Sequence, residues 1–180
     1  MVFLDRDGVI NKYPGHFQYV SSSEDFKFLS GAKKALKRLC DAGYKIFVIS
    51  NQAGVKKGLY SQKTLDSITD NMLKSLKRFG VNITGVYYCT HIDADNCPCR
   101  KPKAGLIQKA LREHKIPKSS LKKAFIVGDS IRDVQTGKNA GCRTILVLSG
   151  KENMNEKSSW PEKPDYIAHD LSMAVDIILS

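Results

Sequence analysis

The chain has 180 residues, of which 42% are hydrophobic and 26% are charged, a composition typical of a soluble globular protein with its own core. No apolar run approaches the roughly 20 residues of a membrane span, and no basic segment followed by an apolar stretch precedes the first predicted strand. We therefore expect no membrane anchor, no signal peptide and a cytoplasmic setting with reduced thiols. The formal net charge of +11 attracts anions, but the lysines and arginines are scattered over predicted helix faces without a nucleic-acid motif, so we expect no nucleic-acid partner.

Strands and helices are predicted to alternate along the whole chain. Short apolar runs predict strands at 2–4, 45–49, 86–88, 124–127 and 144–148. Apolar residues at helical spacing predict helices at about 32–40, 61–79, 106–111 and 131–140, and from about 171 onwards. This alternation is typical of an α/β protein, and we expect one Rossmann-like, three-layer domain over residues 1–180 with a central parallel sheet. Residues 150–164 are rich in polar residues and proline and are predicted to form a surface loop.

Polar side chains stand at the ends of three of these strands. Asp5 and Asp7 follow the first strand, Ser50 and Asn51 follow the second, and Asp129 follows the fourth. The carboxyl ends of parallel strands meet at one edge of the sheet, where α/β proteins bind their ligands. Carboxylates gathered there suit a hard cation such as Mg²⁺, which also binds substrate phosphates. An aspartate there can attack phosphorus and form an aspartyl-phosphate that water hydrolyses.

A compact loop over residues 89–99 contains three thiols and an imidazole, those of Cys89, His91, Cys97 and Cys99. Three cysteines and one histidine complete a tetrahedral Zn²⁺ shell and leave no position for substrate. The sequence therefore predicts a structural zinc site in this loop rather than a disulfide. The remaining cysteines, Cys40 and Cys142, lie in apolar contexts and are predicted to be packing residues.

Four short motifs occur in order and resemble those of the haloacid-dehalogenase (HAD) superfamily phosphatases. They are FLDRDGV at 3–9, SNQ at 50–52, RKP at 100–102 and VGDS at 127–130, the last followed by Asp133. Each is weakly specific alone, but all four stand at the predicted strand ends or loops. The resemblance covers nearly the whole chain and implies a Mg²⁺-dependent phosphoric monoester hydrolase.

The resemblance also implies a role for each motif residue. Asp5 would be the nucleophile, and Asp7 would be the general acid for the leaving oxygen and then the base that activates water. Ser50 and Lys101 would hold the transferring phosphoryl group. Mg²⁺ would be bound by the Asp5 and Asp129 carboxylates and the backbone carbonyl of Asp7. Asp133 would either orient the metal shell or simply complement the dipole of the helix that it begins.

The zinc loop runs directly into RKP, which resembles the zinc-containing, capless subgroup of these phosphatases. This subgroup includes enzymes for D-glycero-D-manno-heptose 1,7-bisphosphate and for histidinol phosphate. The segment NQAGVKKG at 51–58 resembles the heptose group, and a basic rim that includes Lys12 favours a second phosphate over a cationic amine. Ser130 departs from the lysine often found there in the heptose group. The predicted substrate-binding residues are Asn51, Gln52, Lys56, Lys57, Arg100, Ser130 and His16.

The sequence thus favours hydrolysis of the heptose bisphosphate to the 1-phosphate. One alternative is a histidinol-phosphate phosphatase. Another, of a different class, is a non-catalytic, zinc-stabilised basic binding module. The capless design favours a monomer.

Overall fold

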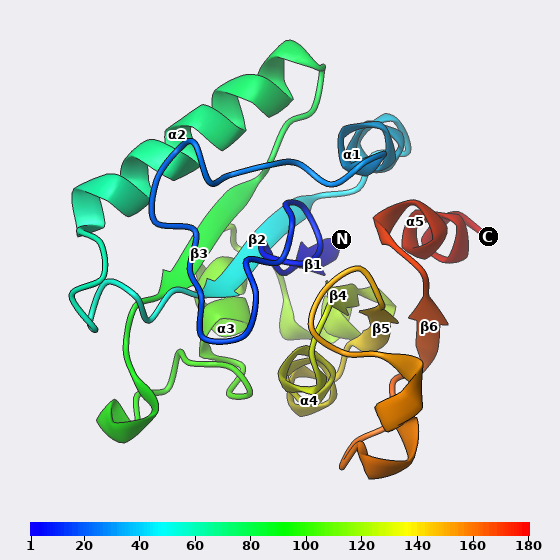
Figure 1. The fold of residues 1–180 in the computed structure, drawn as a ribbon. Coiled ribbons are helices and arrows are strands. Elements are labelled where there is room, and N and C mark those ends of the chain that lie inside the picture. Colours follow the sequence, from blue (N-terminus) through cyan, green and yellow to red (C-terminus); the bar gives the residue numbers. More distant parts are fainter.

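Six parallel strands form one sheet in the order β3-β2-β1-β4-β5-β6 (Figure 1). The computed structural model describes the backbone of residues 1–180 and every side chain except that of Glu156. The strands are β1 (Val2–Leu4), β2 (Ile46–Asn51), β3 (Gly85–Cys89), β4 (Phe125–Gly128), β5 (Arg143–Val147) and β6 (Tyr166–Ala168). The α-helices are α1 (Ala32–Asp41), α2 (Gln62–Arg78), α3 (Gly105–Glu113), α4 (Ile131–Ala140) and α5 (Leu171–Leu179).

Helices cover both faces of the sheet. Helices α1, α2 and α5 lie on one face, and α3 and α4 lie on the other (Figure 1). Apolar residues at helical spacing, such as Leu36 and Leu39 of α1, pack with the strands beneath them. The central strand β1 is buried completely because it has a partner strand on each edge and helices on each face. The predicted three-layer α/β architecture with a parallel sheet is confirmed.

The structure extends the sequence-based prediction in three places. Ser50 and Asn51 lie within β2 rather than after it. Strand β6 was not predicted, because it has only three residues at the sheet edge and its first residue, Tyr166, is exposed. Residues 150–164 are mostly exposed, as predicted, but contain a 3₁₀-helix (Met154–Ser159) and the buried Trp160, which packs in a cluster with α4. Among the described residues, no helix combines the length and apolarity needed to cross a bilayer.

The register of the sheet determines where the site is built. Leu4 of β1 is paired with Val48 of β2 on one side and with Val127 of β4 on the other. The backbone N–H of Asp5 donates to the Val127 carbonyl at 2.9 Å. The carboxyl ends of β1, β2 and β4 therefore lie side by side, and the residues that follow them meet at one edge.

Candidate active site

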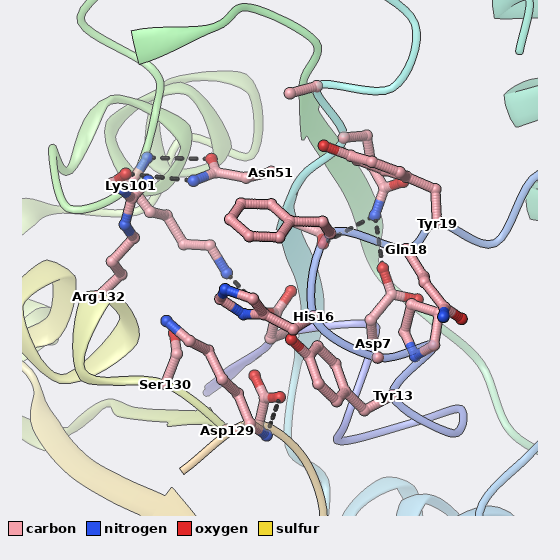
Figure 2. A pocket seen from close by; sticks show the side chains of 18 of the residues that line it. Asp7, Tyr13, His16, Gln18, Tyr19, Asn51, Lys101, Asp129, Ser130 and Arg132 are labelled. Carbon is pink, nitrogen blue, oxygen red and sulfur yellow. Dashed lines mark hydrogen bonds and ion pairs between the residues drawn. The ribbon is translucent and has the colours of Figure 1, made fainter. Parts of the chain in front are cut away.

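A cavity of about 350 Å³ opens at this edge of the sheet (Figure 2). Of the residues predicted from sequence, it is lined by Asp5, Asp7, His16, Ser50, Asn51, Gln52, Lys57, Arg100, Lys101, Asp129 and Ser130. The structure thus brings together in one cavity groups from three strand ends and from several loops.

Asp5 and Asp133 share one buried cation, the Lys101 ammonium. Lys101 Nζ lies 2.9 Å from Asp5 Oδ2 and 2.5 Å from Asp133 Oδ1, and it donates to the Ile49 carbonyl at 3.1 Å. Lys101 is 2% exposed, and burial of a charge without a partner is costly, so these contacts hold the ammonium in place. The Asp133 carboxylate also accepts from the Ser130 hydroxyl at 2.6 Å. Asp133 therefore fixes Lys101 and the start of α4 relative to Asp5.

A divalent cation fits the carboxylates of Asp5, Asp129 and Asp133. One oxygen of each lies within 4.8 Å of the others. Burial, opposed by the Lys101 charge, raises the pKa of Asp5 to about 6, and burial with repulsion from Asp5 and Asp133 raises the pKa of Asp129 well above its usual value. A hard cation would relieve this repulsion, and carboxylate oxygens are the ligands that Mg²⁺ prefers.

Backbone packs closely around Asp129. Its Oδ2 accepts from the Lys151 backbone N–H at 2.8 Å. A Cβ atom at Gly150 would lie 2.1 Å from that oxygen, and one at Gly8, whose φ is +79°, would lie 2.2 Å from it. Both positions need glycine because the backbone must pass directly against the carboxylate. Lys151 also lines the cavity, so the segment predicted as a surface loop contributes to the site at its start.

Asp7 is held by hydrogen-bond donors from three side chains. The buried Arg6 guanidinium donates through Nε and Nη2 to Asp7 Oδ1 at 3.1 and 3.0 Å. Asn11 Nδ2 donates to the same oxygen at 2.8 Å, and Gln52 Nε2 donates to Asp7 Oδ2 at 2.9 Å. Gln52 is fixed in turn by Tyr60, whose hydroxyl donates to Gln52 Oε1 at 2.8 Å. These contacts fix the orientation of the Asp7 side chain at the cavity wall, where 20% of it is exposed.

Two residues of the second motif connect the catalytic segments. The Ser50 hydroxyl accepts from Gln52 Nε2 at 3.1 Å. Asn51 exchanges two hydrogen bonds with the backbone of Lys101, donating to its carbonyl at 3.1 Å and accepting from its N–H at 3.0 Å. Asn51 therefore lines the cavity while it also positions Lys101 (Figure 2).

The four predicted zinc ligands form a second cluster beside the cavity. Cys89 Sγ lies 3.6 Å from Cys97 Sγ and 3.3 Å from Cys99 Sγ, and His91 Nδ1 lies 3.6 Å from Cys89 Sγ and 3.3 Å from Cys99 Sγ. Zinc–sulfur bonds of about 2.3 Å in a tetrahedron give edges of about 3.8 Å, so the cluster needs only a slight expansion to hold Zn²⁺. All five cysteines are free of disulfides, and the geometry fits the predicted zinc site.

Lys56 and Lys57, which are neighbours in the predicted basic rim, lie in different surroundings. Lys57 lines the cavity, and its Nζ donates to the Tyr19 hydroxyl at 2.9 Å. Lys56 does not line the cavity, and its Nζ lies 3.7 Å from Asp95 of the zinc loop. Lys12 is exposed and is also absent from the cavity wall. The basic rim is therefore narrower than the sequence suggested.

Sequence reasoning missed several residues of the cavity wall, namely Tyr13, Phe17, Gln18, Tyr19, Asp93, Arg132 and Lys151. The first four come from the irregular segment after β1, which could have been expected to fold over the site but not residue by residue. Arg132 and Asp93 meet across the rim, where Arg132 Nη1 donates to Asp93 Oδ1 at 3.3 Å. No local pattern in the sequence indicates this contact, because the two residues lie 39 positions apart.

Similarity to known proteins agrees with this geometry. Residues 98–174 match the family model described as HAD-hydrolase-like. The chain is 39% identical over 166 residues to the D-glycero-beta-D-manno-heptose-1,7-bisphosphate 7-phosphatase of Helicobacter pylori strain 26695, and this match covers 92% of each chain. It is 38% identical to the D-glycero-alpha-D-manno-heptose-1,7-bisphosphate 7-phosphatase of Photorhabdus laumondii, and that match covers 83% of each chain.

A solved structure also resembles the whole chain. The D,D-heptose 1,7-bisphosphate phosphatase of B. bronchiseptica, complexed with magnesium and phosphate, superimposes with a TM-score of 0.88 at 31% identity. The match covers 99% of this chain and 97% of that one.

Proposed function

Because the chain belongs to the heptose-1,7-bisphosphate 7-phosphatase family of HAD-like hydrolases, we propose that it hydrolyses D-glycero-D-manno-heptose 1,7-bisphosphate to the 1-phosphate. The observation that carries the proposal is the buried contact of Asp5 with Lys101, directly beside Asp129 and below a cationic rim. This arrangement offers a nucleophile, charge for the phosphoryl oxygens and a second site for an anion. A small sugar with a phosphate at each end matches all three.

The reaction proceeds in two steps at Asp5. A carboxylate oxygen of Asp5 attacks phosphorus, and the bond from phosphorus to the sugar oxygen breaks. Protonated Asp7 gives its proton to that oxygen, so the sugar leaves as an alcohol. Asp7, now a carboxylate, takes a proton from a water that attacks the aspartyl-phosphate and regenerates Asp5. Arg6, Asn11 and Gln52 hold the Asp7 carboxylate for this second step.

The remaining residues bind and orient the phosphoryl group. The Lys101 ammonium offsets charge on the phosphoryl oxygens, and the Ser50 hydroxyl donates to one of them. Asp5, Asp129 and Asp133, together with the Asp7 backbone carbonyl, would hold Mg²⁺, which supplies further positive charge at the phosphate. Zinc would be held by Cys89, His91, Cys97 and Cys99 and would stabilise the loop that carries Arg100 and Lys101.

The test is phosphate release in the presence of Mg²⁺ from both anomers of the heptose 1,7-bisphosphate and from histidinol phosphate. Asp5→Asn provides the blank, because an amide cannot form the phosphoenzyme. We expect turnover of the bisphosphate by the native protein, much slower turnover of histidinol phosphate and none by Asp5→Asn. Preferred hydrolysis of histidinol phosphate would replace the substrate, whereas no hydrolysis of any ester by folded, metal-loaded protein would favour the basic binding module.

A further inference from the structure

Arg132 is a cation in the cavity wall that the proposed chemistry at Asp5 does not use. It is the second residue of α4, and its side chain is 46% exposed. In Figure 2 it lies beside Ser130 and on the same side of the pocket as Asn51, across from Gln18 and Tyr19. Because Arg132 lines the same cavity as Asp5, a ligand that fills the cavity could contact both side chains.

Asp93 holds two guanidinium groups at this part of the rim. Its Oδ1 accepts from Arg100 Nε at 2.7 Å and from Arg132 Nη1 at 3.3 Å, and its Oδ2 accepts from Arg100 Nη2 at 3.3 Å. One carboxylate between two guanidiniums leaves a net positive charge at the rim.

The two arginines differ in how many donors they can offer a ligand. Arg100 is engaged through all three of its nitrogens, since Nη1 also donates to the His91 carbonyl at 3.1 Å, and its side chain is 15% exposed. Among the described side chains, Arg132 makes one long hydrogen bond, which leaves most of its five N–H donors for a ligand. Arg132 is therefore the more available of the two for bidentate contact with a phosphate.

Ser130 cannot supply this contact in the geometry observed. Its hydroxyl donates to Asp133 Oδ2 at 2.6 Å, so its one proton is used inside the site. The positive charge nearest to Ser130 on α4 is that of Arg132, two residues further along the chain. The cationic group in the first turn of α4 is therefore at position 132, whereas position 130, where a lysine is often found in the heptose group, carries no charge.

We propose that Arg132, which Asp93 holds at the rim, binds the phosphate of the substrate that is not hydrolysed and thereby selects sugar bisphosphates over monophosphates. The inference rests on the proposed function, since it assumes a substrate with a second phosphate. It assigns to this chain a specificity-determining residue that the sequence motifs do not contain.

The test compares the ratio of kcat/KM for heptose 1,7-bisphosphate to kcat/KM for heptose 7-phosphate in native protein, Arg132→Met and Arg132→Lys. A charge-assisted hydrogen bond contributes about 1.5–3 kcal/mol, so we expect Arg132→Met to lower this ratio at least about tenfold. Arg132→Lys retains the charge without the planar fork and should recover part of the ratio. Arg38→Met is the matched control, because Arg38 forms a similarly exposed pair with Asp176 away from the cavity, and it should leave the ratio unchanged.

A binding measurement separates this inference from the proposed function. Binding of heptose 1,7-bisphosphate is measured by calorimetric titration of two variants, Asp5→Asn and the double variant Asp5→Asn with Arg132→Met. This measurement does not require either variant to hydrolyse the ligand. Affinity about tenfold weaker in the double variant supports the role of Arg132 even if the native protein hydrolyses neither ester. An unchanged affinity, an unchanged kinetic ratio, or failure of Asp5→Asn to bind the bisphosphate overturns it.

Discussion

The two clusters of side chains that could bind a metal ion in this protein are assembled in opposite ways. Cys89, His91, Cys97 and Cys99 come from one loop of eleven residues, whereas Asp5 and Asp129 come from strand ends more than 120 residues apart. In the first cluster His91 is exposed but Cys89, the last residue of β3, is buried, and the second cluster is almost completely buried. The members of the first cluster are neighbours in sequence, whereas the carboxylate cluster exists only when the whole sheet has formed.

The two clusters nevertheless meet in one short segment. Arg100 and Lys101 follow Cys99 directly, and Lys101 reaches Asp5. The loop therefore delivers the buried cation to the carboxylate cluster, while Asn51 fixes the Lys101 backbone from β2. A change in the carboxylate cluster should stop the chemistry and spare the fold, whereas a change in the loop should disturb both.

The largest expected effect comes from Asp7→Asn, which removes the proton donor and acceptor but keeps the shape. General acid–base catalysis contributes about 10²–10⁴-fold, so kcat for the heptose bisphosphate should fall by about 10³ without loss of zinc. With p-nitrophenyl phosphate, whose leaving group needs no proton, the first step should continue and the second should slow. Rapid-quench measurements should then show a burst of about one nitrophenol per chain. Equal slowing of both steps, with no burst, would contradict the proposed role of Asp7.

The next largest effect is expected from Cys97→Ser, which removes one of the four predicted zinc ligands. We expect loss of bound zinc by elemental analysis, a lower melting temperature and a fall of about tenfold in kcat/KM, because the loop that carries Lys101 loses its tether. Cys40→Ser is the matched control, since its thiol lies at the end of α1 outside the cluster and should not affect zinc. Retained zinc and an unchanged melting temperature in Cys97→Ser would show that the loop does not need the metal.

The residues of both clusters could be predicted from the sequence, but the contacts across the rim of the cavity could not. The four predicted zinc ligands were found from their spacing within eleven residues, and the structure places them in one cluster. The predicted catalytic residues were found from motifs at the ends of predicted strands, and the structure places them in one cavity. Contacts across the rim could not be predicted, because Asp93 and Arg132 meet only through the packing of the loop against α4. For the same reason the sequence grouped Lys56 with Lys57, whereas the turn after β2 directs Lys56 to Asp95.

Melting temperatures measured with and without Mg²⁺ over a pH series should test whether the buried carboxylate cluster binds the cation. Burial raises the pKa of Asp5 from its usual 3.8 to about 6, so the folded state holds a proton that the unfolded state releases above about pH 4. Without a cation, this group therefore destabilises the fold as pH rises from about 4 through 6. Because Mg²⁺ binds the ionised carboxylates, its stabilising effect should increase over the same range. We expect the rise in melting temperature on adding Mg²⁺ to be about 3 °C or more larger at pH 7.5 than at pH 5.

The control for this series is Asp129→Asn. It removes one carboxylate of the buried cluster and should abolish most of the stabilisation by Mg²⁺ at pH 7.5. A magnesium effect that is independent of pH, or that survives in Asp129→Asn, would show that the cation binds elsewhere.

The smallest expected effect distinguishes two adjacent lysines on the rim. Lys57 lines the cavity and donates to Tyr19, so Lys57→Ala should raise KM for the heptose bisphosphate about threefold through loss of an exposed charge near the substrate. Lys56→Ala makes the same chemical change one residue earlier, where the ammonium faces Asp95, and should leave KM within about twofold of the native value. Measured at low ionic strength, where an exposed charge is least screened, equal effects of the two substitutions would mean that the rim acts through its overall field. A selective effect of Lys57→Ala would mean that the phosphate is bound by particular side chains, as we propose for Arg132.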